Sequence, residues 1–105
     1  RRSGVDEQAL KGLLLSTGLP VAYSHFNTAP EPPYVVYLFD GSENFGADNK
    51  AYHRQSSYRV ELYTPKHDPA VLAQLENLFD ANDIFWEKDE AWIDSEKLFQ
   101  TVYYV

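Results

Sequence analysis

Three histidines are the first residues in this chain of 105 residues that could bind a metal or transfer protons. They are His25, His53 and His67, and no two of them have a metal-binding spacing such as i, i+4 on a helix. The chain has no cysteine, which excludes disulfides, thiolate metal sites and cysteine nucleophiles. We therefore expect three unrelated histidines, with no metal ion and no cofactor.

A run of oxygen-bearing side chains begins at Asp40 and continues with Ser42 and Asn44, as in the first half of a calcium-binding loop. Such a loop requires Gly at its sixth position and Glu at its twelfth, where this chain has Phe45 and Ala51. Because these two positions form the turn and supply the bidentate ligand, calcium binding is not expected.

The common enzyme motifs do not occur in the sequence. There is no Gly-x-Ser-x-Gly, and the five glycines form no phosphate-binding loop. Neighbouring acids such as Asp89 and Glu90 lie in hydrophilic sequence, whereas a general acid needs an apolar pocket that raises its pKa. We expect no catalytic residues and a protein that is not an enzyme.

The charge balance excludes several partners. Nine basic and sixteen acidic residues give a formal net charge of −7, and the acids concentrate between Asp80 and Glu96. Such a surface does not suit nucleic acid, which is bound by clustered Lys and Arg. No apolar run reaches the length of about 18 residues that a membrane span needs, and no signal peptide is evident. Since the chain has no methionine, we expect Arg1–Gly4 to be an added or disordered segment before a single domain.

The elements that must position any site begin with a helix. Leucines at i, i+3 and i+4, from Leu10 to Leu14, predict a helix capped by Ser3 or Asp6. A short strand is predicted over Val21–Phe26. The three prolines that follow predict a stiff connection to the next element.

The middle of the chain predicts two strands around a long polar loop. Tyr34–Phe39 is uninterrupted and apolar, which is typical of a strand covered on both faces. The loop covers residues 42–50. Tyr58–Tyr63 alternates between apolar and polar residues, and we expect its face with Arg59 and Glu61 to be open to water.

The last part of the chain predicts a helix and two strands. Asp68-Pro69 begins the helix, because an acidic cap followed by Pro at the first position is a typical start signal. The strands are Ile84–Lys88 and Lys97–Val105, joined by the acidic segment Asp89–Glu96. The predicted fold is a single-domain α+β sandwich with the order helix, three strands, helix, two strands. Its antiparallel or mixed sheet has about five strands, with two helices packed on one face.

The aromatic residues of the last strands have two interpretations. Phe99, Tyr103 and Val105 would form an exposed apolar surface prone to association unless a helix or another subunit covers them. Either core packing or a subunit contact would satisfy this requirement. The same two alternatives apply to Trp86 and Trp92.

A longer pattern links the predicted strands to a known class of proteins. It consists of Pro33–Tyr37, Ala47–Tyr52, Tyr58–Thr64 and the helix start at Asp68-Pro69. Together with the element order, this pattern resembles the small tail-terminator, tail-completion or head–tail joining proteins of long-tailed bacteriophages, which prophages also encode. The resemblance implies a non-enzymatic virion subunit without an active site. Such subunits form a ring, expected to be a hexamer closed on a template, that ends the tail tube and joins it to the head connector.

The resemblance implies partners and candidate contact residues. The partners are further copies of the chain, the tail tube protein and head-connector proteins. A ring requires two different patches on each subunit. We expect one patch in the final strand and one in the polar loop, with candidate residues Phe99, Tyr103 and Val105 and residues Asp40, Phe45, Asp48 and Asn49. DNA passes through the lumen of such rings, where carboxylates would repel phosphates, and the candidates for that role are Asp89, Glu90 and Asp94.

Two other functions are compatible with the sequence. The chain could be a small bacterial cytoplasmic adaptor or regulatory module that binds another protein as a monomer or dimer. It could also be a small α+β enzyme or ligand-binding protein. Ring formation that depends on concentration, a discrete dimer, and thermal stabilisation by a metabolite would distinguish the three functions.

Overall fold

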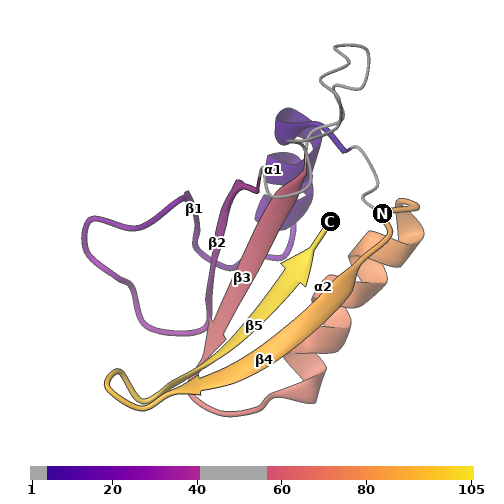
Figure 1. Cartoon of the computed structure of the whole chain (residues 1–105). Coiled ribbons are helices and arrows are strands. Elements are labelled where there is room, and N and C mark those ends of the chain that lie inside the picture. Colours follow the sequence, from indigo (N-terminus) through magenta and orange to yellow (C-terminus); the bar gives the residue numbers. More distant parts are fainter. Residues whose placement is uncertain (1–4, 41–56) are drawn as a thin grey trace, which may run out of the picture.

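The computed structural model describes residues 5–40 and 57–105, which form two helices and five strands (Figure 1). The predicted α+β fold and element order are confirmed. In chain order the elements are α1 (Glu7–Leu15), β1 (Val21–Tyr23), β2 (Tyr34–Phe39), β3 (Tyr58–Thr64), α2 (Pro69–Ala81), β4 (Glu87–Ile93) and β5 (Leu98–Tyr104).

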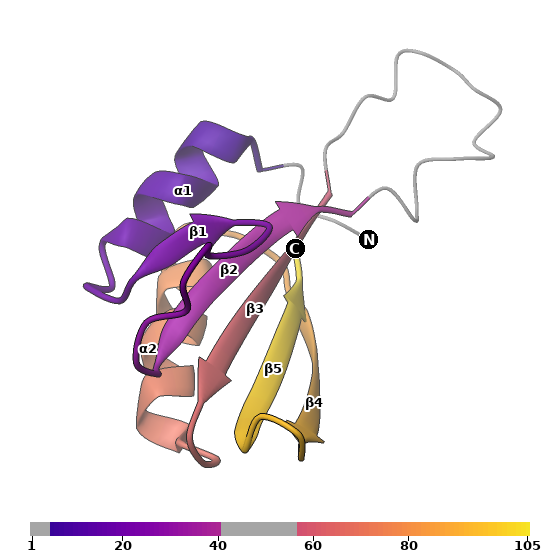
Figure 2. The ribbon, with the colours of Figure 1, turned by 90° about the vertical axis from the view of Figure 1, so that its left-hand side faces the viewer.

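The five strands form one mixed sheet in the order β1-β2-β3-β5-β4. β1 pairs with β2 in parallel, and the other neighbours are antiparallel. Both helices cover the same face of the sheet (Figure 2). The other side of the sheet, which carries no helix, is called the open face below. The last strand, β5, lies inside the sheet, and β1 and β4 form its edges.

The main core lies between the two helices and the sheet. Leu10 and Leu14 come from α1, because leucines spaced by four residues lie on one side of a helix. Every second residue of the strands points to the same layer, as the pleat requires. The fully buried side chains here are Leu10, Leu14, Val35, Val60, Leu62, Phe79, Tyr103 and Val105.

Both helices begin at the predicted caps. The backbone N–H of Ala9 donates to Asp6 Oδ1 at 2.8 Å, so Asp6 is the cap of α1. In α2 the side chain of Asp68 caps the helix and Pro69 occupies the first position. These signals are local in sequence, which is why they could be predicted.

Gly12 weakens α1 without a packing reason. A Cβ added at this position would meet no atom within 4 Å, among the residues that the structure describes. Gly12→Ala is therefore expected to raise the free energy of unfolding by about 0.5–1 kcal/mol in urea titrations. Gly18→Ala is the control, and it should lower stability because Gly18 has a φ of +83°. A destabilised Gly12→Ala would contradict this account.

The first strand is shorter than predicted. It ends at Tyr23 instead of Phe26, because Ser24 takes a φ of 72° and turns the chain. The backbone N–H of His25 then donates to the carbonyl oxygen of Tyr23 at 2.7 Å. The segment from Ser24 to Pro33 leaves the sheet plane and lies over the open face, where Phe26 packs against Tyr34.

The fourth strand was placed wrongly by the sequence prediction. Ile84–Lys88 was predicted as the strand, with residues 89–96 as a connection. β4 instead covers Glu87–Ile93 and pairs residue by residue with β5, from Glu87 opposite Tyr104 to Ile93 opposite Leu98. An edge strand can keep charged side chains in water, so an acidic segment can form one.

The prediction that one face of the third strand is open to water was also wrong. Glu61 is only 9% exposed, and β3 is a central strand. The carboxylate of Glu61 accepts hydrogen bonds from Arg59 Nε at 2.9 Å and from the Tyr63 hydroxyl at 2.8 Å. These two donors satisfy the charge that burial would otherwise destabilise.

Candidate interaction surfaces

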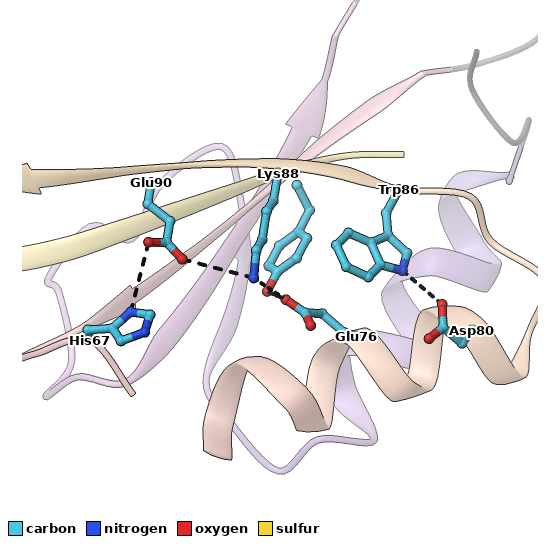
Figure 3. A network of polar contacts seen from close by, with 7 residues as sticks. His67, Glu76, Asp80, Trp86, Lys88 and Glu90 are labelled. Carbon is cyan, nitrogen blue, oxygen red and sulfur yellow. Dashed lines mark hydrogen bonds and ion pairs between the residues drawn. The ribbon is translucent and has the colours of Figure 1, made fainter. Parts of the chain in front are cut away.

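A network of polar side chains joins α2 to the edge strand β4 (Figure 3). Glu76 is at its centre, since its Oε2 accepts from the Tyr103 hydroxyl at 2.7 Å and from Lys88 Nζ at 2.8 Å. Burial, followed by the hydrogen bond to Glu76, raises the pKa of Tyr103. Tyr103 therefore keeps its proton at neutral pH and acts as a hydrogen-bond donor.

Two further contacts extend this network along β4. His67 Nδ1 lies 3.9 Å from Glu90 Oε1, near the start of α2. At the other end, the indole Nε1 of Trp86 donates to Asp80 Oδ1 at 2.9 Å. Figure 3 shows these side chains in a row between helix and strand. These contacts hold β4 against α2. Each charged side chain of the row already has a partner, so we assign the row a structural role.

The edge formed by β4 is the first candidate interaction surface, called the β4 surface. Within residues 5–40 and 57–105, no strand pairs with its outer side, which leaves backbone groups available to a partner. Trp92 stands on this strand with 48% of its surface exposed, and its Nε1 donates to Asp94 Oδ1. Exposed tryptophan with a satisfied N–H is typical of protein-binding surfaces. Trp86, in contrast, is half-buried against Tyr103.

The opposite edge of the sheet is the second candidate and is called the β1 surface. It consists of β1 with Tyr23 and the end of α1 with Leu15, which are 46% and 51% exposed. Four strand spacings separate the two edges, a distance of roughly 19 Å. The β1 surface is apolar where the β4 surface is acidic. The two edges therefore present unlike chemistry.

A groove lies between the two helices. Its volume is about 520 Å³, and its walls include Val5, Gly12, Leu13, Leu78 and Ile84. The walls are mainly apolar and carry no charged side chain.

The predicted interface residues fall into four groups, the last of which is buried in the core. Asp40 follows β2 directly, and its backbone N–H donates to the Ser57 carbonyl at 2.7 Å. Phe45, Asp48 and Asn49 lie outside the described residues. Phe99 is half-buried and its ring contacts the rings of His67 and Trp92, which brings it close to the β4 surface.

Tyr103 and Val105 are not surface residues. Both are 0% exposed and belong to the main core under the helices. The reason is the position of β5 inside the sheet, where α2 covers it. Of the two alternatives open from the sequence, core packing is the correct one for this pair.

The three acids predicted to face a lumen do not form one surface. Asp89 and Glu90 are neighbours on β4, so they point to opposite faces of the sheet. Glu90 faces α2 and His67, and Asp94 lies in the turn after the strand, paired with Lys97 at 3.2 Å.

Among the described residues, no group of three or more His, Asp or Glu side chains could hold a metal ion. Neither of the helices in this part combines the length and the apolar character needed to cross a bilayer. No family model, curated protein or solved structure matches the chain.

Proposed function

We propose that this chain is a non-enzymatic structural subunit of a bacteriophage virion. Copies of it close into a ring, a hexamer formed on a template, that ends the tail tube and joins it to the head connector. The proposal includes the partners that this position requires, which are further copies of the chain, the tail tube protein and head-connector proteins. Assembly takes place in the host cytoplasm.

The observation that supports a ring best is the pair of unlike surfaces at opposite edges of one sheet. A head-to-tail contact joins one patch to a different patch on the next copy, and it closes into a ring when the rotation between copies allows it. The β4 surface offers a free strand edge with an exposed Trp92. The β1 surface offers Leu15 and Tyr23 on the other side. A two-fold dimer would need only one self-complementary patch.

A single substitution in either surface is expected to prevent ring formation, and a mixture of the two variants is expected to form a dimer. Trp92→Glu blocks the β4 surface and Leu15→Glu blocks the β1 surface, because each puts a charge into an apolar contact. Alone, each variant should be monomeric at concentrations where the unchanged chain forms a closed ring. Mixed in equal amounts, they should form a dimer and nothing larger, since one intact patch remains on each partner. Size exclusion with light scattering measures these masses.

Asn77→Glu is the matched control, because it adds the same charge on the exposed side of α2, and it should still form rings. Electron microscopy of the unchanged chain should show a closed particle with a central hole. If the chain stays monomeric at every concentration, the same variants are compared on purified tail tubes as the template, and a chain that forms no ring there would contradict the proposal. If the unchanged chain forms a discrete dimer, and mixing the two variants does not produce a dimer, the adaptor function is favoured instead.

A further inference from the structure

A pocket on the open face lies where three elements meet. The segment after β1 contributes His25 and Phe26, the central strands contribute Tyr34 and Tyr63, and the β4–β5 turn contributes Glu96. Figure 1 shows the β1–β2 connection and the β4–β5 turn at the same end of the sheet. The volume is about 350 Å³, enough for one amino-acid side chain or a small ligand. We call it the open-face pocket.

Aromatic rings form the floor and one wall of this pocket. The rings of Tyr34 and Tyr63 are stacked with centroids 5.1 Å apart, and Phe26 meets Tyr34 edge-to-face at 5.4 Å. Ring faces carry negative electrostatic potential and attract cations. Tyr63 is also held in place, because its hydroxyl donates to Glu61 and accepts from Gln100 Nε2 at 2.9 Å. The wall is therefore already ordered without a ligand.

A carboxylate lies at the rim with no partner of its own. Glu96 forms no hydrogen bond through its side chain and no ion pair with any of the described residues, whereas nearby Asp94 pairs with Lys97. Glu96 lines the pocket together with the rings of Phe26, Tyr34 and Tyr63, and its charge adds to burial in raising the pKa of Tyr34. Within residues 5–40 and 57–105, no Lys or Arg lines the pocket. The pocket therefore offers a carboxylate and aromatic ring faces to a cation, and the basic group must come from another molecule.

We propose that the open-face pocket binds the guanidinium group of an arginine side chain presented by another protein. A guanidinium is planar, so it can lie flat on an aromatic ring while its N–H groups donate to a carboxylate, which an ammonium does less well. The net charge of −7 favours the approach of such a group. The pocket lies within one chain, so this inference does not depend on ring assembly.

Capped arginine and capped citrulline test the chemistry directly. Citrulline has the same shape but is neutral, so it separates charge from fit. In a nuclear magnetic resonance titration of the full chain, N-acetyl-arginine amide should shift the signals of Phe26, Tyr63 and Glu96, with a Kd of about 1–10 mM. The citrulline analogue should bind at least about fivefold more weakly. Equal binding of both, or no shift of these signals, would overturn the proposal.

Two variants show which groups carry the binding. Glu96→Gln should weaken capped arginine about fivefold, and Phe26→Leu should weaken it by a factor of about two to five. Glu87→Gln is the matched control, because it removes one charge from an exposed residue at the far end of β4 and should leave the affinity unchanged. An equal loss in Glu87→Gln would assign the binding to the overall charge and overturn the site. Urea unfolding of each variant separates lost binding from lost folding.

Discussion

Replacing Phe79 by Ala is expected to lower the free energy of unfolding by about 3–5 kcal/mol. Phe79 is 0% exposed on α2, and its ring meets Tyr103 edge-to-face at a centroid distance of 5.6 Å. The substitution removes this contact and leaves a cavity between α2 and the centre of the sheet. Because small domains are stable by only about 5–15 kcal/mol, a large share of the stability should be lost.

Urea titrations followed by circular dichroism give the required free energies. The control is Asn77→Ala, two residues away on the exposed side of the same helix, which should change stability by less than about 0.5 kcal/mol. Leu75→Ala, at another buried position of α2, should cost about 2–5 kcal/mol. If Phe79→Ala lost no more than Asn77→Ala, α2 would not be packed on the sheet as described.

The second large effect is a loss of stability in alkali. Burial and a hydrogen bond to Glu61 raise the pKa of Tyr63 to about 12, and burial and the bond to Glu76 raise the pKa of Tyr103. Below pH 10 the phenols are protonated in both the folded and the unfolded chain, so their stabilisation is complete. Above pH 10 the unfolded chain ionises first, and stability falls until the folded phenols ionise as well.

The expected slope is up to about 1.4 kcal/mol per pH unit for each such tyrosine. Fully buried Tyr103 should contribute more than Tyr63, which is partly screened by water. Urea midpoints measured at rising pH, together with phenolate absorbance, provide the test. Tyr103→Phe should cost about 1 kcal/mol at neutral pH and make the alkaline slope shallower. An unchanged slope in Tyr103→Phe would show that this phenol ionises equally in both states.

The sequence by itself determined the features that depend on neighbours along the chain. Each of these signals lies within a few residues of the element that it specifies. They are the spacing of Leu10 and Leu14, the caps at Asp6 and Asp68, and the apolar run Tyr34–Phe39. The element order and the α+β class followed from these signals. The charge of −7 also follows from composition alone.

Tertiary structure decided everything that depends on which strands become neighbours. β5 enters the sheet between β3 and β4, and this one pairing buries Tyr103 and makes acidic Glu87–Ile93 an edge strand. The sequence of β4 is hydrophilic, so no periodicity marked it as a strand. Its pairing partner is β5, which follows directly after the turn at residues 94–97, and the pairing with β5 makes this hydrophilic segment a strand.

The open-face pocket shows the same dependence. Phe26, Tyr63 and Glu96 are separated by more than thirty positions from one to the next. The sequence around each of them does not indicate a binding site, and Glu96 is one of sixteen acidic residues. These three residues converge because the start of β2, the end of β3 and the β4–β5 turn lie at the same end of the sheet, and Ser24 turns the chain back toward it. Local sequence determines which elements form, whereas the contact between distant side chains exists only after the strands have paired.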